Sequence, residues 1–236
     1  MVSLLTFTTP PHPCAYLPDR AASLEYEVVA AADAADYAGR MVAGWRRFGH
    51  QFFRPVCEGC SACRSLRVPV ATFHPDRSQR RAAAANADTR LVIDTPKVTP
   101  AKLALYDRFH AFQAESKGWP GHGPKDAMEY AESFTVNPFP TEEWRYYRGR
   151  RLTGVGYVDH LPGALSAIYF YYDPDERERS PGTFNVLSVL ARAAELGYEQ
   201  VYLGYYVKGC RSLEYKARFR PNEVLAGNGE WMPFLT

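Results

Sequence analysis

The sequence predicts an α+β protein in two parts: a cysteine-containing N-terminal α/β domain, residues 1–98, and a strand-rich C-terminal domain, residues 99–236. Three of the five cysteines recur at three-residue spacing in the first part. The second part starts with helical patterns and changes to strand patterns from Glu142 onwards. A chain of 236 residues with 46% hydrophobic content is long enough to bury a packed core.

The first part is expected to alternate helices and strands. Asp33 is predicted to cap a helix whose apolar residues recur at helical spacing: Tyr37, Met41, Trp45 and Phe48. Residues 66–70 alternate like a short strand, and Pro69 favours an edge position because proline has no N–H to donate. Residues 76–86 predict a short basic helix, and residues 91–93 predict a strand.

Two helices are expected to open the second part. Thr99 followed by Pro100 is typical of a helix start, and Gly118 is expected to end that helix. A loop rich in glycine and proline follows at residues 117–124, and residues 125–134 predict a second, shorter helix.

From Glu142 onwards the pattern predicts strands. A hairpin is expected to turn at Gly149, and a third strand is expected at residues 164–173. A helix at residues 180–197 and a strand at residues 200–206 follow directly. Three strands, a helix and a strand in this order are the layout of a GNAT-like (acyl-CoA N-acyltransferase-like) core.

Composition narrows the function classes. The net charge of +2 and the pI of about 8.2 exclude a bulk polycation, so any nucleic-acid contact must come from local basic patches. No run approaches the roughly 20 apolar residues that span a bilayer, and the N-terminus lacks the pattern of a signal peptide. We therefore expect a soluble cytoplasmic protein without a membrane partner.

The cysteines suggest a metal site. Spacing of the C-x-x-C kind lets one loop aim two thiolates at a single point, as zinc and iron–sulfur sites require. In a reducing cytoplasm such cysteines are metal ligands or redox groups more often than disulfides. The alternative is a set of reduced cysteines packed together without metal. The candidate ligands are Cys14, Cys57, Cys60 and Cys63.

The loop at residues 174–183 bears on whether the protein binds coenzyme A. A helix N-terminus at this place in a GNAT-like core offers N–H groups to a pyrophosphate. Such loops are normally rich in glycine, but here Gly182 stands alone and Pro181 removes a donor. Coenzyme A binding is therefore disfavoured, and an ordinary solvated loop is the alternative.

A basic and aromatic segment at residues 204–221 suits a single-stranded nucleic-acid end. Cations neutralise phosphates while aromatic faces stack on unpaired bases. A solvated face of a terminal strand is the alternative. The candidate nucleic-acid contacts are Lys208, Arg211, Arg218 and Arg220.

A third basic cluster consists of Arg77, Arg80 and Arg81. Guanidinium groups bind carboxylates in a bidentate manner, so converging arginines could recognise an acidic side chain. Exposed helix arginines without a ligand are the alternative. The six histidines show no H-E-x-x-H spacing, and neither a G-x-S-x-G elbow nor a P-loop is present, which disfavours hydrolases.

Five segments follow one another over nearly the whole chain: CAYLPDR, GWRRFGHQFFRPVCEGCSACRSLRVPV, DRSQRR, YVDHLPGALSAIYFYYDPDERERSPGTFNVL and YLGYYVKGCRSLEYKARFRPNEVL. Together they resemble the arginyl-tRNA–protein transferase family. The run of cysteines most resembles its short bacterial branch, the aspartate/glutamate leucyltransferases.

The resemblance implies transfer of leucine from leucyl-tRNA to the N-terminal amine of proteins that begin with Asp or Glu, which marks them for degradation. No cofactor is required for the transfer, although zinc or an iron–sulfur cluster is implied at the cysteines by eukaryotic relatives. The resemblance also implies that the tRNA acceptor end occupies the ground that coenzyme A uses elsewhere, in agreement with the poor pyrophosphate loop.

The expected chemistry needs no nucleophile from the enzyme. The donor is an activated ester, and an α-amine with a pKa of about 7.7–8.0 is largely free at neutral pH. Positioning and an oxyanion donor would then supply the acceleration. Tyr205 and Lys216 are the candidate donors, and Asp159 and Asp173 are candidates to orient the amine. Arg77, Arg80 and Arg81 are the candidates for recognising the acidic residue.

Three other interpretations remain open at the level of sequence. The first is arginyl rather than leucyl transfer by the same mechanism. The second is an RNA-binding module that is stabilised by a metal ion at its cysteines and has no transferase activity. The third is a coenzyme A-dependent acetyltransferase.

Overall fold

The computed structural model describes residues 1–121 and 123–234. A four-stranded antiparallel sheet in the order β1-β4-β6-β5 forms the N-terminal part. A two-residue pair of strands, β2 (His12–Pro13) and β3 (Ala21–Ala22), lies between β1 and β4 in the chain. The strands of the small sheet are β1 (Val2–Thr8), β4 (Leu24–Ala31), β5 (Arg46–Phe48) and β6 (Gln51–Pro55).

An eight-stranded sheet forms the centre of the molecule, in the order β14-β13-β7-β12-β11-β10-β9-β8. Two of its strands, β7 and β8, come from the first 98 residues, so the sheet contains residues from both sides of the predicted domain boundary at residue 98. The division into two domains stays a prediction. The strands of the large sheet are β7 (Arg64–Pro69), β8 (Thr89–Asp94), β9 (Thr141–Arg148), β10 (Arg151–Leu161), β11 (Ala164–Tyr172), β12 (Gln200–Tyr206), β13 (Glu223–Leu225) and β14 (Trp231–Pro233).

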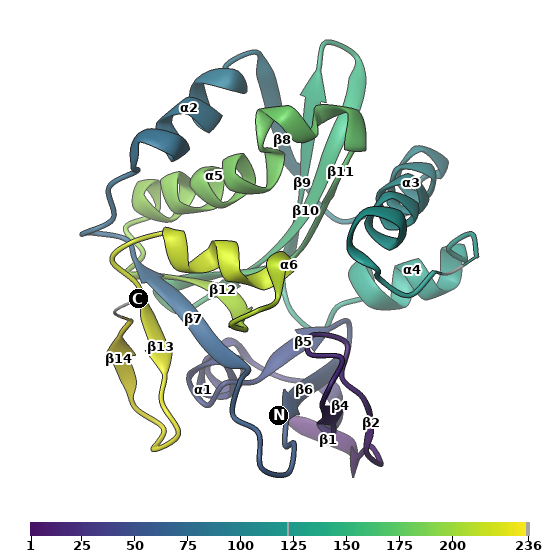
Figure 1. Ribbon diagram of the computed structural model, residues 1–236, viewed down its shortest axis with the longest axis vertical. Helices are drawn as coiled ribbons and strands as arrows, with labels where there is room; N and C mark the ends of the chain where they lie inside the picture. The colour runs from purple at the N-terminus through teal and green to yellow at the C-terminus, as the bar shows by residue number, and fades with distance from the viewer. Residues whose placement is uncertain (122, 235–236) are drawn as a thin grey trace.

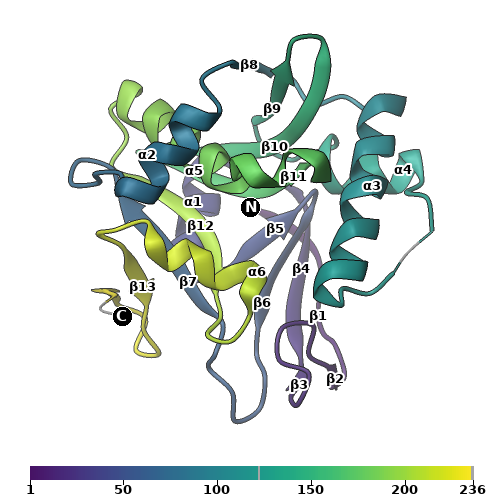
Figure 2. The same cartoon turned by 45° about the horizontal axis from the view of Figure 1, so that its top comes forward.

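Helices cover both faces of the large sheet (Figures 1 and 2). On one face, α5 packs through Val186, Val189 and Leu190, and α2 lies against α5. On the other face, α3 and α4 bury Phe109 and Tyr130. The helices are α1 (Ala34–Val42), α2 (Arg77–Ala85), α3 (Pro100–Lys117), α4 (Ala127–Phe134), α5 (Pro181–Glu195) and α6 (Arg211–Glu214), with 3₁₀ turns η1 (Pro174–Arg179) and η2 (Tyr215–Arg218).

The local signals for helix ends are confirmed. Asp33 caps α1 in a reciprocal capping box with Asp36, and Thr99 caps α3 by accepting from the Lys102 N–H. Gly118 ends α3 in the left-handed conformation. None of the described helices combines the length and the apolar character needed to cross a membrane.

The predicted edge position of Pro69 is wrong. Strand β7 lies inside the sheet, between β13 and β12. Pro69 is tolerated because β13 pairs with β7 only at Leu66 and Arg67, so the missing N–H of Pro69 interrupts no pairing on that side. The ladder toward β12 is continued by the next residue, since the Val70 N–H donates to the Glu199 carbonyl.

The predicted order of three strands, a helix and a strand is confirmed, and with it the mixed α+β class and the GNAT-like core. Strands β9, β10 and β11 are antiparallel, and α5 connects β11 to a parallel β12. The parallel pairing spans only three residue pairs, from Ala164–Gln200 to Ser166–Tyr202. Beyond Ser166 and Tyr202 the two strands separate, and the separation opens the centre of the sheet.

Candidate active site

A cavity of about 620 Å³ lies where β11 and β12 separate. Its wall is built from β5, β11, β12, α3, the start of α5 and the α6–η2 segment, together with Ala15 and Tyr16. The volume falls in the range of sites that hold small ligands and cofactors. The sheet therefore places a large, partly apolar cavity at the opening of its parallel strand pair.

The cavity is cationic. Its described lining residues include six basic side chains and neither an aspartate nor a glutamate. Such a surface attracts anions and repels cations. The basic residues are Arg46, Arg47, Lys117, Arg177, Arg211 and Lys216.

Arg47 is neutralised by a buried aspartate. The guanidinium donates through Nε to Asp159 Oδ2 at 2.7 Å, and a second nitrogen contacts Oδ1. Tyr37 and Thr141 each donate a further hydrogen bond of 2.7 Å to the same carboxylate. Asp159 is fully buried and is not among the described residues that line the cavity, so its predicted role in orienting the amine has no geometric support.

Arg46 has a different environment. One terminal nitrogen donates to the Ala167 carbonyl at 2.8 Å, and no carboxylate of a described residue lies within ion-pair distance of the guanidinium. Only 7% of the residue is exposed, and burial lowers the pKa of its side chain. Arg46 therefore carries a buried charge without an acidic partner in the described part of the chain.

Lys216 lies beside Arg46 and is likewise without an acidic partner in the described residues. Its Nζ donates to the Tyr205 carbonyl at 3.0 Å. Burial, followed by the nearby Arg46 charge, lowers the pKa of Lys216 from 10.5 to about 7. The carbonyls of Ala167 and Tyr205 both lie beyond the last parallel residue pair, so the two cations bind main-chain oxygens at the opening of the sheet.

Gly204 lies close to both cations. It adopts a φ of +83° at the irregularity where the register of β12 with β7 shifts. A Cβ at this position would lie 3.3 Å from a terminal nitrogen of Arg46 and 3.3 Å from Nζ of Lys216. The absence of a Cβ at Gly204 therefore lets the Arg46 guanidinium and the Lys216 ammonium both approach the main chain at this point.

The other predicted catalytic residues lie in different surroundings. Tyr205 lines the cavity, but its hydroxyl donates to the Gly44 carbonyl at 3.0 Å, and burial raises the pKa of that hydroxyl. Asp173 is buried at the start of η1, where it binds Arg151 and Arg108. Asp173 is not among the described lining residues, and the catalytic assignments stay predictions.

The predicted binding residues are divided between the cavity and the surface. Arg211 lines the cavity, whereas Lys208, Arg218 and Arg220 do not. The three arginines of α2 are exposed and stand outside the described cavity lining, with Arg80 donating to the Pro75 carbonyl at 2.6 Å. Their substrate-binding role stays a prediction. The arginines concerned are Arg77, Arg80 and Arg81.

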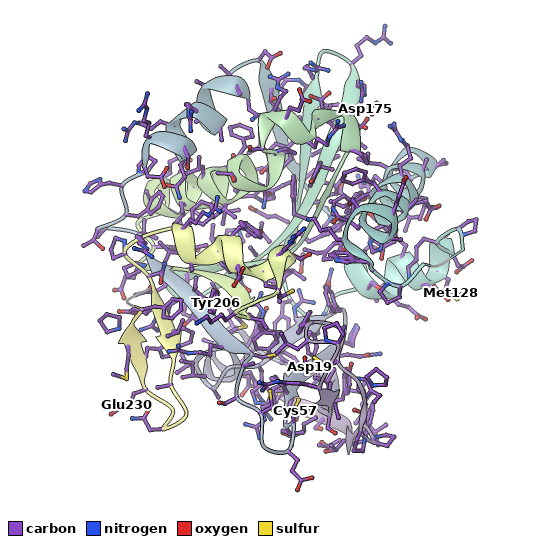
Figure 3. All side chains as sticks on the ribbon, viewed as in Figure 1. Asp19, Cys57, Met128, Asp175, Tyr206 and Glu230 are labelled. Carbon is purple, nitrogen blue, oxygen red and sulfur yellow. The ribbon has the colours of Figure 1, made fainter. Side chains whose placement is uncertain are left out.

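All five cysteines gather around Cys63. Burial, then the charges of the other four thiols, raises the pKa of Cys63 to about 12. Cys210, which the sequence did not assign to this group, also lines the cavity. Cys57 lies at the opposite end of the molecule from Asp175 (Figure 3). The other predicted ligands are Cys14 and Cys60, and the five thiols form no disulfide.

The cysteines do not form a metal site in this arrangement. Among the described residues, no group of three or more Cys, His, Asp or Glu side chains is placed to hold a metal ion. The thiols instead contact the protein: Cys60 accepts from Arg20 at 3.3 Å, and Cys57 accepts from the Ser23 N–H at 3.4 Å. The zinc or iron–sulfur cofactor therefore stays a prediction, and no step of the chemistry below involves it.

Sequence reasoning missed the wall of the cavity that α3 and the following loop provide. Phe109, Gln113 and Trp119 line it, and Trp119 donates from its indole nitrogen to Ser212 at 3.2 Å. Gln113 is 1% exposed, and its Oε1 has no partner among the described atoms. The sequence predicted α3 as a helix but could not show which of its residues border a cavity rather than the core.

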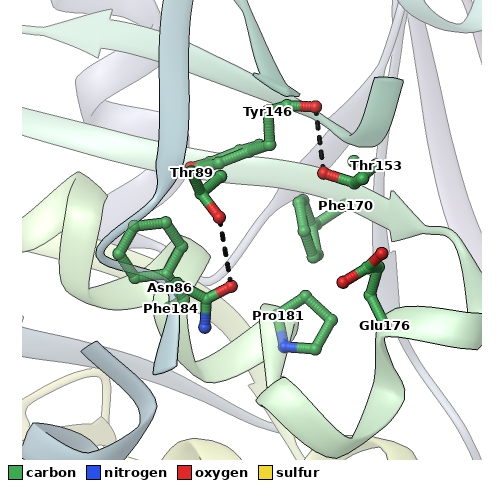
Figure 4. Close-up of a pocket in the computed structure, with 9 residues that line it drawn as sticks. Asn86, Thr89, Tyr146, Thr153, Phe170, Glu176, Pro181 and Phe184 are labelled. Atoms are coloured by element: carbon green, nitrogen blue, oxygen red, sulfur yellow. Dashed lines mark hydrogen bonds between the residues drawn. The ribbon is translucent and has the colours of Figure 1, made fainter. Parts of the chain in front are cut away.

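A second pocket, between α2, α5 and the end of β9, is much smaller (Figure 4). Its volume is about 10 Å³, which is the space of at most one water molecule. The one carboxylate in its described lining, Glu176, is held by Arg148 at 2.6 Å. This pocket has room only for solvent.

Two solved structures show the same fold at low sequence identity. The C-terminal domain of a putative lysylphosphatidylglycerol synthetase from Agrobacterium fabrum has a TM-score of 0.50 and 15% identity, over 83% of this chain and 62% of that one. FemX has a TM-score of 0.52 and 7% identity, over 81% of this chain and 66% of that one. These similarities concern the fold alone.

Sequence comparison is more specific. Family models described as arginine-tRNA-protein transferase, N terminus and C terminus, match residues 12–81 and 101–226. An aspartate/glutamate leucyltransferase of Campylobacter jejuni is 35% identical over 95% of this chain and 94% of its own length. One of Pseudomonas savastanoi pv. phaseolicola is 36% identical over 98% and 97%. The chain belongs to the arginine-tRNA–protein transferase family.

Proposed function

We propose that this protein is an aminoacyltransferase that moves leucine from leucyl-tRNA to the N-terminal amine of proteins that begin with Asp or Glu. The observation that carries the proposal is the cavity, whose described lining has six basic side chains and no acidic one. Both substrates bring negative charge to the site: the phosphates of the tRNA acceptor end and the acidic first residue of the protein.

The exposed cations at the cavity suit the tRNA end. Lys117, Arg177 and Arg211 are exposed, so they can contact successive phosphates while counterions are released to solvent. Aromatic side chains of the wall, including Phe109 and Trp119, offer faces on which an unpaired base can stack. We place the tRNA acceptor end along this side of the cavity.

The reaction needs positioning more than activation by a side chain. The amine nitrogen attacks the ester carbonyl, a peptide bond forms, the ester C–O bond breaks, and the ribose hydroxyl leaves with a proton that derives from the amine. Holding the two reactants together in the cavity supplies the acceleration. A donor to the developing oxyanion adds to it, and the hydroxyl of Tyr205 is already committed to the Gly44 carbonyl.

The test is to offer the protein leucyl-tRNA, arginyl-tRNA and acetyl-coenzyme A, each with a peptide that starts with Asp. We expect leucyl transfer to the α-amine, seen as a mass increase of one leucyl residue. Arginyl transfer alone would replace leucine by arginine as the donor. Acetyl transfer alone, or RNA binding without any transfer, would overturn the proposal.

The cysteine site needs its own experiment. We propose that Cys14, Cys57, Cys60 and Cys63 can hold zinc or an iron–sulfur cluster once their side chains rotate toward one another. The support is their gathering around Cys63. Metal analysis and absorption spectra of anaerobically purified protein test this directly, and a metal-free preparation with full activity would end the cofactor claim.

A further inference from the structure

We propose that Arg46 and Lys216 together recognise the side-chain carboxylate of the substrate's first residue, above Gly204. The inference rests on the proposed function, and it assigns the specificity of the site to two residues. Neither residue belongs to the arginine cluster that the sequence singled out for this role.

Among the basic residues that line the cavity, Arg46 is buried and Lys216 is half-buried, and neither has an acidic partner in the described part of the chain. A buried ion in a folded protein is normally paired, because an isolated buried charge is costly. Arg47, next in the chain, follows that rule with Asp159. Arg46 and Lys216 donate to main-chain carbonyls and have no carboxylate partner among the described residues. The missing partner is an anion that the substrate can bring.

The geometry suits one small anion. A terminal nitrogen of Arg46 and the Nζ of Lys216 each lie 3.3 Å from the point that a Cβ on Gly204 would occupy. The two nitrogens are therefore separated by no more than twice that distance. One carboxylate can bridge two such donors with its two oxygens, in charge-assisted hydrogen bonds.

A carboxylate fits this position better than a phosphate of the tRNA. A phosphodiester chain is bound by exposed cations with release of counterions, and the cavity has those at Lys117, Arg177 and Arg211. Arg46 is 7% exposed and is fixed on β5, so it suits a single desolvated group. A peptide that begins with Asn presents a neutral amide instead and leaves both cations unneutralised, which is how a polar site rejects a near-isostere.

The experiment measures kcat/KM for leucyl transfer to two peptides that differ only in Asp or Asn at the first position. Arg46→Met and Lys216→Met are compared with the wild type. We expect each variant to lose about 100-fold with the Asp peptide, mainly in KM, and little with the Asn peptide. The Asp-to-Asn preference then falls toward one. Arg150→Gln, at an exposed position outside the described cavity lining, should keep the wild-type values.

A charge reversal sharpens the test. Lys216→Glu should shift the preference toward a peptide that begins with Lys, while Lys216→Met should not. Equal losses with the Asp and Asn peptides, together with weaker tRNA binding, would assign the two cations to the tRNA or to the transfer step and overturn the inference.

Measuring peptide binding without tRNA tests this inference separately from the proposed function. Calorimetry of the protein with the Asp and Asn peptides, without any tRNA, measures recognition alone. If the wild type binds the Asp peptide in preference and Arg46→Met loses that preference, the inference stands even where leucyl transfer fails. Equal binding of both peptides by the wild type would overturn it even where transfer succeeds. Thermal unfolding of each variant shows that it is folded.

Discussion

Arg46 and Arg47 are neighbours on the same short strand, are both almost fully buried, and have opposite electrostatic surroundings. Arg47 is enclosed by Asp159 and by neutral hydrogen-bond partners. Arg46 binds a main-chain carbonyl and faces a second cation, Lys216, across Gly204. A buried arginine is therefore not a functional signal by itself. The signal is a buried charge that has no counter-ion in the described part of the fold.

The largest effect on stability is expected when the buried ion pair between Arg47 and Asp159 is broken. Asp159→Asn leaves Arg47 buried without its counter-ion, and breaking a buried pair lowers the free energy of unfolding by about 3–5 kcal/mol. Urea unfolding followed by circular dichroism measures the change. Asp175→Asn, at a largely exposed carboxylate, is the control and should change it by less than about 0.5 kcal/mol. Wild-type stability with abolished leucyl transfer would instead support the predicted catalytic role of Asp159.

Gly204→Ala should disturb the positions of the two cations beside it, Arg46 and Lys216. The left-handed φ of +83° costs an alanine about 1–2 kcal/mol, and the new methyl group would lie 3.3 Å from each cationic nitrogen. We expect lower stability and a selective rise of KM for the Asp peptide. Gly39→Ala is the matched control, because a Cβ there meets nothing within 4 Å and alanine favours the helix. An unchanged KM in Gly204→Ala would show that the carboxylate binds elsewhere.

The pH dependence follows from Lys216. Burial and the charge of Arg46 lower its pKa to about 7, while Cys210 acts in the opposite direction. An acidic ligand binds its protonated form, so binding is strongest below pH 7 and weakens as the pH rises above 7 and the lysine loses its proton. The Asp-to-Asn ratio of kcat/KM should fall by as much as about tenfold per pH unit there.

Taking the ratio of the two peptides removes the titration of the α-amine, which both peptides share. The same measurement on Lys216→Met should give a ratio that is flat with pH. A ratio that is equally steep in the wild type and in this variant would assign the titration to another group.

The smallest effect is expected at α2. Arg80→Gln removes an exposed charge that contacts the Pro75 carbonyl, outside the described cavity lining. Stability should change by less than about 0.5 kcal/mol, and the Asp-to-Asn ratio should stay at the wild-type value. A selective loss with the Asp peptide would support the role that the sequence predicts for Arg77, Arg80 and Arg81.

Local signals in the sequence predicted the fold well. Caps such as Asp33 and Thr99 act within a few residues, so the starts of α1 and α3 could be anticipated. The expected helical positions of Trp45 and Phe48 were wrong, because α1 ends at Val42 and Phe48 lies in β5. The strands β9 to β11, the crossover helix α5 and the order of these elements along the chain were also predicted. The position of Pro69 was not, because the neighbours of β7 in the sheet are strands from the far C-terminal part of the chain.

The candidate site was harder to predict because it is marked by cations that lack an acidic partner among the described residues. In the segment GWRRFGH the two arginines are equivalent, and only the distant Asp159 distinguishes them. Lys216 was singled out only by its position in a motif, and Cys210 joins the other cysteines only in three dimensions. No spacing rule shows that a charge lacks a partner, since that requires knowing every neighbour in the described structure.

The separation of β11 from β12 has a further consequence for how such a site can change during evolution. The two strands expose main-chain oxygens, and these oxygens, rather than acidic side chains, hold Arg46 and Lys216 in place. A peptide carbonyl is present whatever residue occupies the position, so substitutions along the strands leave this support intact. The anchoring of the two charges is therefore robust to substitutions along the strands. The selectivity that the charges confer is instead lost when either Arg46 or Lys216 is replaced.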